Sequence, residues 1–322
     1  SIILSELMKI FQYNTITKFD LHGISVAMGN FDGLHLGHKA VIEMARPKDV
    51  KKKFGVVTFE PHPREFFNSK TQSFRLMNKS SKTLELSELG LDVLIEIPFN
   101  KELSLLDPKT FVSEVLCNYF KFKHIVVGED FKFGYQRQGN AKILKELGAV
   151  FGCNVTIAKL IKSDNLEISS TKIRKALSDG RPENAAKMLG KYYSIAGKVL
   201  HGEKRGRTLG FPTLNLALDE LHLPKFGVYS SVVEIITGKY SGVYNAVVSL
   251  GERPTYGRRN PNLEAHLINF SGDLYGEHVS VSLINFQRPE LYFENSQRLI
   301  EQMKLDCKIA QKNLWELRNH EK

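Results

Sequence analysis

The chain has 322 residues. This exceeds the usual size of a domain with a single hydrophobic core, so two domains are expected. Its 42% hydrophobic and 25% charged residues are ordinary for a soluble globular protein. No apolar stretch reaches the roughly 20 residues needed to cross a bilayer, which argues against a membrane protein.

The formal net charge of +10 leaves two interpretations open. A nucleic-acid-binding protein is one, because Lys and Arg neutralise phosphates. The other is a solvated basic face, such as Lys51–Lys53, combined with sites for small anionic substrates. No zinc-finger, RNP-like or basic-helix pattern accompanies the charge, so we favour small-molecule substrates and no nucleic acid.

Three cysteines, Cys117, Cys153 and Cys307, are far apart and lack metal-ligand spacing. Their odd number and scatter fit packing roles in a reduced, cytoplasmic protein.

The first half alternates buried strands with helices. Strands are expected at residues 24–28, 54–59, 92–97, 124–128 and 154–158, and helices at 110–120 and 139–152. This alternation predicts a doubly wound α/β domain, a parallel sheet covered on both faces. Its ligand should bind beyond the carboxyl ends of the strands.

The segment GNFDGLHLGH, Gly29 to His38, follows the first of these strands. Its glycines let backbone N–H groups approach an anion, and a helix should begin at its end. His35 and His38 can project from one side of that first turn, which favours a phosphate site. Zinc is the alternative, with His62 as the nearby candidate for a third ligand. The chain has neither a GxxxxGK[ST] loop nor a GxGxxG turn.

A second candidate anion site is ISSTKIRKAL, residues 168–177. Ser169 is a suitable N-cap, and Ser170 and Thr171 place hydroxyl and N–H groups on the first helical turn. Arg174 adds positive charge. A well-capped amphipathic helix without a ligand explains the same residues. This helix and a second one at 182–189 mark the domain boundary.

The segments GNFDGLHLGH, TFEPHP, FRL (74–76), GEDFKFG (128–134) and ISSTKIR resemble the FMN adenylyltransferase module of bacterial bifunctional riboflavin kinase/FMN adenylyltransferases. The resemblance implies AMP transfer from ATP to FMN by a domain spanning residues 1–188. His35 and His38 would contact the phosphates and stabilise charge, and Ser170, Thr171 and Arg174 would hold the β- and γ-phosphates. The nucleotide- and flavin-binding residues implied for this module are Gly29, Phe31, Asp32, Gly33, His35, His38, Arg75, Asp130, Ser170, Thr171 and Arg174.

After Gly190 the pattern changes to closely spaced strands at 229–237, 241–250, 263–270 and 278–286, followed by a helix at 294–317. This predicts an antiparallel sheet or small barrel with a terminal helix.

Thr213 and Asn215 lie two residues apart in GEKRGRTLGFPTLN (202–215), so in an extended segment their side chains face the same side, where they are suitable Mg²⁺ ligands. A surface hairpin with a basic loop is the alternative. Glu264 is a candidate base on a strand, where exposed carboxylates are also common.

GKVLHGEKRGRTLGFPTLN, GVY (227–229), GERPTYG, LEAHL and GDLYG resemble the riboflavin kinase module of the same family. The resemblance implies a domain over 189–322 with a six-stranded antiparallel barrel and a terminal helix. It would phosphorylate the riboflavin 5′-hydroxyl, with Glu264 as base and Mg²⁺ held through Thr213 and Asn215. Lys204, Arg207 and Gly210 would complete the ATP site. Leu214 departs from the usual Ala of this module. In the adenylyltransferase module, Met77–Asn78 follows Arg75 and Leu76 where hydroxyl residues are common.

The sequence thus predicts a cytoplasmic, Mg²⁺-dependent enzyme that makes FMN and then FAD from riboflavin and two ATP molecules. Its partners would be these small molecules, and nothing in the sequence indicates an oligomeric state. The rival hypothesis is a basic nucleic-acid-binding protein built from the same two folds.

Overall fold

The computed structural model describes residues 8–12, 21–67, 74–159, 162–163, 166–201, 210–218, 221–255 and 258–320. They form two compact units. The first, here called the sheet unit, comprises Ile2–Thr71 and Thr83–Ile168. The second, here called the barrel unit, comprises Gln72–Lys82 and Ser169–Lys322, with Ser1.

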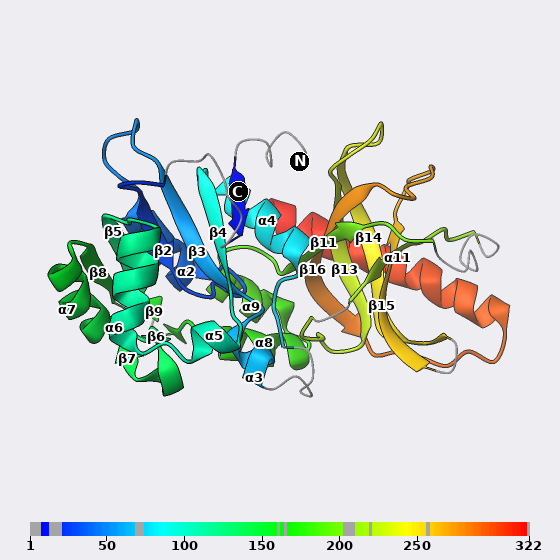
Figure 1. The fold of residues 1–322 in the computed structure, drawn as a ribbon. Helices are drawn as coiled ribbons and strands as arrows, with labels where there is room; N and C mark the ends of the chain where they lie inside the picture. The colour runs from blue at the N-terminus through cyan, green and yellow to red at the C-terminus, as the bar shows by residue number, and fades with distance from the viewer. Residues whose placement is uncertain are drawn as a thin grey trace. The chain divides into compact units, whose positions relative to one another are not determined.

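The sheet unit has a parallel sheet whose strands occur in the order β1-β4-β3-β2-β5-β8 (Figure 1). The six strands are β1 (Lys9–Gln12), β2 (Ser25–Met28), β3 (Phe54–Glu60), β4 (Val93–Pro98), β5 (His124–Gly128) and β8 (Asn154–Ala158). From β2 the chain passes to β3 and β4 on one side, then returns to β5 and β8 on the other. The topological switch point therefore lies between β2 and β5, where parallel sheets of this kind bind ligands.

The remaining elements of this unit surround the sheet. They are α2 (Leu36–Ala45), α3 (Pro63–Phe67), α5 (Lys101–Ser104), α6 (Pro108–Thr110), the π-helical η1 (Phe111–Tyr119), β6 (Lys132–Phe133), the 3₁₀ turn η2 (Tyr135–Arg137), β7 (Gly139–Asn140), α7 (Ala141–Phe151), β9 (Lys162–Ser163) and β10 (Leu166–Glu167). Helix α4 (Lys79–Glu88) starts in the barrel unit and ends in the sheet unit.

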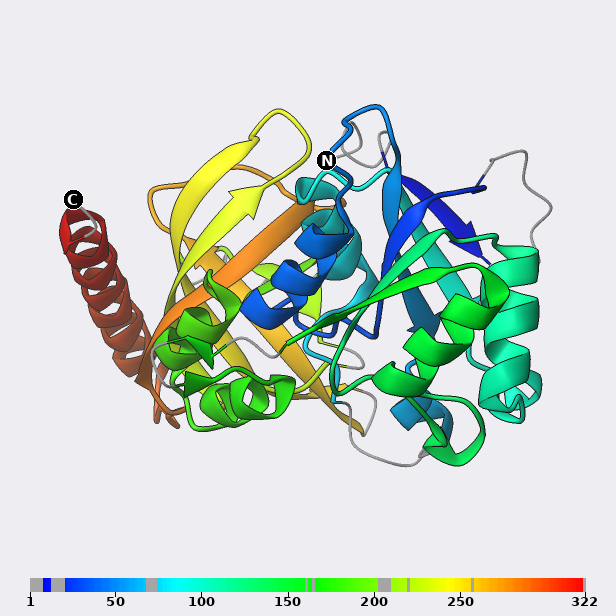
Figure 2. The ribbon, with the colours of Figure 1, turned by 90° about the vertical axis from the view of Figure 1, so that its left-hand side faces the viewer.

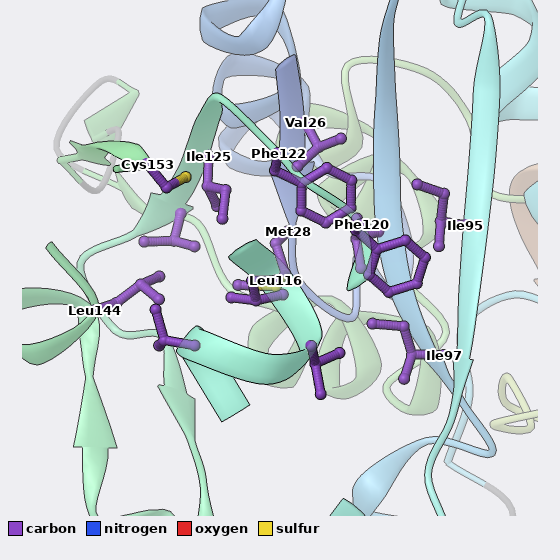
Figure 3. Close-up of a cluster of buried hydrophobic side chains, with 14 of the residues drawn as sticks. Val26, Met28, Ile95, Ile97, Leu116, Phe120, Phe122, Ile125, Leu144 and Cys153 are labelled. Carbon is purple, nitrogen blue, oxygen red and sulfur yellow. The ribbon is translucent and has the colours of Figure 1, made fainter. Parts of the chain in front are cut away.

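One continuous apolar cluster fills the space between the sheet, η1 and α7 (Figure 3). Val26 and Met28 of β2, Ile125 of β5 and Ile95 of β4 contribute to it from alternate strand positions, as the period of two requires. Leu116 of η1 is fully buried in it. Helix α2 packs on β2 and β5 with other buried residues, so the sheet is covered on both faces.

The barrel unit is a nearly closed antiparallel sheet in the order β11-β16-β13-β14-β15-β12 (Figure 2). Its strands are β11 (Ser194–Lys198), β12 (Leu214–Ala217), β13 (Gly227–Ile235), β14 (Gly242–Thr255), β15 (Arg258–Leu267) and β16 (His278–Arg288), and its helices are α8 (Ser170–Ser178), α9 (Pro182–Leu189) and α11 (Ser296–His320). An isolated bridge between Leu200 and Asn215 brings the two edge strands together.

The segment 74–82 is hydrogen-bonded to the barrel. Asn78 Nδ2 donates to the carbonyl oxygen of Ala196 in β11 at 2.8 Å, and Ala196 N donates to Ser81 Oγ at 2.9 Å. These bonds are far apart in sequence and partly or fully buried. The barrel unit therefore includes residues that lie within the first half of the chain.

The predicted fold class, a parallel-sheet domain and a six-stranded antiparallel barrel with a terminal helix, is confirmed. The strands expected at 124–128 and 154–158 have the expected bounds, and the helix at 110–120 is π-helical. Strands β1 and β11 and helix α4 were not predicted, because they are short or weakly patterned. Of the cysteines, Cys153 is buried while Cys117 and Cys307 are half-buried, and all three are free thiols. Residues 1–7 lie outside the described ranges.

Helix α11 is attached to the barrel by a buried ion pair. Arg288 Nη2 and Nε, at the end of β16, donate to the two carboxylate oxygens of Asp306 at 2.7 and 2.9 Å. The Asp306 side chain is only 3% exposed, and Gln302 also donates to it. Removing one partner would leave the other charge buried and uncompensated.

We predict that Asp306→Ala lowers the free energy of unfolding of the barrel unit by about 3–5 kcal/mol. Circular dichroism during chemical denaturation reports this transition through the helical signal of α11. Glu316→Ala is the control, because the pair of Glu316 with Lys312 on the same helix is exposed and should contribute at most about 1 kcal/mol. Equal effects of the two substitutions would contradict this assignment.

Candidate functional sites

The segment Gly29–His38 lies at the topological switch point of the sheet. It leaves the carboxyl end of β2 and leads into α2, and Gly29 N donates to the carbonyl oxygen of Val57 at 3.1 Å. Three of its residues have positive φ angles: Phe31 (50°), Gly33 (92°) and Leu34 (42°). Two non-glycine residues in this region cost energy, and such strain often marks functional turns.

The two histidines of this segment lie against each other. Their rings stack with centroids 3.5 Å apart, and the edge of Phe31 meets His38 at 5.4 Å. His35 is the N-cap of α2, and its Nδ1 accepts a hydrogen bond from His38 N at 3.2 Å. Because Nδ1 accepts, a neutral His35 must carry its proton on Nε2, which is then a donor.

Burial keeps the His35 imidazole neutral. Desolvation is the largest influence on its pKa and lowers it to about 4, and the nearby Lys39 acts in the same direction against a raising backbone hydrogen bond. Near neutral pH this side chain therefore offers an N–H donor without a full positive charge. Together with the first turn of α2, this arrangement suits an anionic ligand.

The alternative of a zinc site receives no support. Among the residues that the structure describes, no group of three His, Cys, Asp or Glu side chains could hold a metal ion. His62 Nδ1 accepts a hydrogen bond from Arg64 N at 3.1 Å, within its own turn. Because zinc sites usually need three or four protein ligands, this finding favours phosphate, and the role of the stacked pair stays a prediction.

Asp130 lies just beyond β5, the strand beside β2 on the other side of the switch point. Its side chain is exposed, and its Oδ1 lies so close to Gly128 that a Cβ there would be 2.8 Å away. The two strands are parallel, with Ala27 opposite Val126, so the residues that follow them, the Gly29–His38 segment and Asp130, lie at the same edge of the sheet. Asp32, within that segment, is half-buried.

The second predicted anion site is placed on α8, in the barrel unit. Ser169 caps the helix by accepting from Lys172 N at 3.3 Å, as expected. Ser170 is half-buried and Thr171 exposed on the first turn. Arg174 turns toward the FRL segment: its Nε donates to the carbonyl oxygen of Phe74 at 2.6 Å. The structure therefore joins Arg174 to Phe74, the neighbour of Arg75, although the two motifs lie about a hundred residues apart in the chain.

The candidate kinase residues meet on two paired strands. Asn215 of β12 lies directly opposite Glu264 of β15, and both carry their side chains on the same face. Asn262, two residues before Glu264, donates from Nδ2 to Asn215 Oδ1 at 3.1 Å and to Glu264 Oε1 at 3.5 Å. Asn215 is buried and Glu264 half-buried. One amide group thus orients both predicted functional side chains.

Thr213 lines a cavity of about 160 Å³ at the end of this strand pair. The stacked rings of His201 and Tyr275, 3.4 Å apart, form another part of its wall. Thr213 and Asn215 alternate, so a hydroxyl and an amide oxygen are presented to one side, and both are hard ligands that fit Mg²⁺. Gly210 has a positive φ of 83°, and a Cβ added to it would meet no atom within 4 Å. Lys204 and Arg207 lie outside the described residues.

Sequence reasoning missed Asn262 and His222. Asn262 could have been found, because residues two apart on a strand share a face with Glu264. His222 carries no motif signal, and its contacts only become visible in three dimensions. Within the described ranges, no helix combines the length and apolar character that crossing a membrane requires.

Each half of the chain matches a family of known proteins. A FAD synthetase family model matches residues 17–172, and a riboflavin kinase family model matches residues 189–314. Two relatives are named bifunctional riboflavin kinase/FMN adenylyltransferase. The one from Haemophilus influenzae is 37% identical over 292 residues, covering 90% of this chain and 94% of the relative. The one from Escherichia coli is 34% identical over 295 residues, covering 91% and 93%.

A solved structure from Streptococcus pneumoniae, described as a macrolide-efflux protein, has a TM-score of 0.78 and 28% identity, covering 95% of this chain and 99% of that one. The two family matches follow each other along the chain, and the relatives are covered almost completely. Each match also contains one of the two groups of polar residues described above. The chain belongs to the bifunctional riboflavin kinase/FMN adenylyltransferase family.

Proposed function

We propose that the protein phosphorylates riboflavin with ATP to give FMN and ADP, and then transfers AMP from a second ATP to FMN to give FAD and pyrophosphate. The observation that carries this proposal is that each family match contains its own polar constellation. Gly29–His38 lies at the switch point of the parallel sheet, and the Asn215–Glu264 pair lies on the barrel. We assign residues 1–188 to adenylyl transfer and 189–322 to phosphorylation.

In adenylyl transfer, a phosphate oxygen of FMN attacks the α-phosphorus of ATP, and the bond to the bridging oxygen of the β-phosphate breaks. Such a reaction needs positioning and charge stabilisation rather than a protein nucleophile. The Nε2–H of His35 and the imidazole of His38 would donate to the phosphate oxygens. Ser170, Thr171 and Arg174 would hold the β- and γ-phosphates, and Gly29, Phe31, Asp32, Gly33, Arg75 and Asp130 would complete the nucleotide and flavin contacts.

In riboflavin phosphorylation, the 5′-hydroxyl oxygen attacks the γ-phosphorus of ATP and ADP leaves. Glu264 would accept the hydroxyl proton, and Asn262 would hold its carboxylate in place. Thr213 and Asn215 would hold Mg²⁺, which neutralises phosphate charge when bound. Lys204, Arg207 and Gly210 would contact the ATP phosphates. We further propose a cytoplasmic location and no nucleic-acid partner.

The direct test is incubation of the purified protein with ATP, Mg²⁺ and riboflavin, followed by chromatography. We expect FMN to appear first, then FAD with an equal amount of pyrophosphate. Nucleic acid should not compete at physiological salt. Absence of both flavin products, together with tight salt-sensitive binding of DNA or RNA, would instead support the nucleic-acid-binding hypothesis.

Replacing both His35 and His38 with Ala should lower conversion of supplied FMN to FAD by at least about two to three orders of magnitude, the usual effect of losing one charge-stabilising donor. Phosphorylation of riboflavin should remain near wild type. His22→Ala is the control, since His22 is exposed in the same unit. Loss of a stoichiometric bound zinc on substitution would show that the two histidines are metal ligands after all.

Glu264→Gln keeps the size of the side chain but removes its basicity. Riboflavin phosphorylation should fall by roughly two to four orders of magnitude, the usual contribution of a positioned proton acceptor. Conversion of supplied FMN to FAD should be unaffected. Glu234→Gln, an exposed carboxylate on β13, should change neither activity. Kinase activity of Glu264→Gln within a few-fold of wild type would rule out a role as base.

A further inference from the structure

His222 contacts two residues of α8 from a distant part of the chain. Its Nε2 lies 2.9 Å from the carbonyl oxygen of Arg174 and 2.9 Å from Ser178 Oγ. A carbonyl oxygen can only accept, so Nε2 carries the proton and donates to it. Histidine 222 lies within the riboflavin kinase match, which starts at residue 189. Arg174 lies just beyond the end of the FAD synthetase match, at residue 172.

The backbone at His222 also holds the FRL segment. His222 N donates to the carbonyl oxygen of Arg75 at 2.7 Å, and Leu221 forms a parallel bridge with Arg75. The flanking side chains of Phe74, Leu76 and Leu221 are 7%, 1% and 2% exposed, so the bridge is packed on apolar surface. The position of Arg75 is therefore coupled to that of His222.

Arg174 of α8 contacts the FRL segment directly. Its Nε donates to the carbonyl oxygen of Phe74 at 2.6 Å, and its guanidinium lies 5.3 Å from the centre of the Phe74 ring. Three chain segments, 74–76, 174–178 and 221–222, are thus joined in pairs. A further backbone bond from Lys225 N to the carbonyl oxygen of Leu177, at 2.9 Å, extends the same attachment along α8.

We propose that His222 is a positioning residue for adenylyl transfer, although it lies in the part of the chain that matches riboflavin kinases. Its imidazole fixes the second half of α8, and its backbone fixes Arg75. This inference rests on the proposed roles of Arg75 and Arg174 in that reaction. His222 would act through these residues rather than through contact with a substrate. The kinase part of the chain thereby holds part of the adenylyltransferase site in its working geometry.

Loss of the His222 imidazole should therefore slow adenylyl transfer and leave riboflavin phosphorylation almost unchanged. Displacement of a substrate-positioning group by about 1 Å can lower a rate by about 100-fold. His222→Ala removes the imidazole bond to α8 but keeps the backbone bond to Arg75. Conversion of supplied FMN to FAD should then lose about 10- to 100-fold in kcat/KM, mainly through a higher KM for ATP. Riboflavin phosphorylation should stay within about two-fold, because His222 is not among the residues assigned to that reaction.

The test compares three variants of the full chain. His222→Gln can still donate a side-chain N–H and should recover much of the lost FAD formation. His278→Ala, an exposed histidine on β16, should behave as wild type. Thermal unfolding is measured for each variant, and the expected result is that His222→Gln and His222→Ala melt similarly while differing in FAD formation.

Equal loss of both activities, or FAD formation unchanged in His222→Ala, would overturn the positioning role. So would equal activity of the Ala and Gln variants. Failure of the proposed function is seen separately, because wild-type protein would then make no FAD from supplied FMN and ATP.

Discussion

The arrangement of the first half depends on one constraint: a parallel sheet that is buried on both faces leaves polar chemistry only at its edge. The strands β2, β3, β4 and β5 are almost continuously buried, and the apolar cluster with η1 and α7 occupies one face. The chain can therefore present donors only where the strands end. At the switch point between β2 and β5 the Gly29–His38 segment does so, and the buried His35 caps the helix that follows.

In the barrel, polar side chains lie on the strands themselves rather than only at their ends. An antiparallel sheet has one face toward its core and leaves the other available, so cross-strand neighbours can build a site. Leu214 and Ala265 face the core, while the next pair, Asn215 and Glu264, carries the polar groups. The terminal helix is secured by a buried ion pair away from these residues. The attachment of segment 74–82 shows that this unit also organises residues from the first half of the chain.

Much of this could be predicted from the sequence, because apolar runs separated by glycines identify buried strands and the ends of strands identify sites. The pairing of Asn215 with Glu264 could not, since register depends on the whole barrel. Nor could the hydrogen bond from Arg174, a residue expected to contribute positive charge and to hold phosphates, to the carbonyl oxygen of Phe74. Contacts between residues 75, 174 and 222 arise from long-range packing that leaves no local pattern. Strand β1, only four residues long, lacked enough periodicity to be recognised.

The central claim is that two chemically distinct nucleotide sites exist in one chain. A crystal structure of the protein with Mg²⁺ and a non-hydrolysable ATP analogue tests it most directly. We predict two bound nucleotides, one with its phosphates against Gly29–His38 and one whose Mg²⁺ contacts Thr213 and Asn215. A single nucleotide serving both constellations, or phosphates bound away from both, would contradict the account.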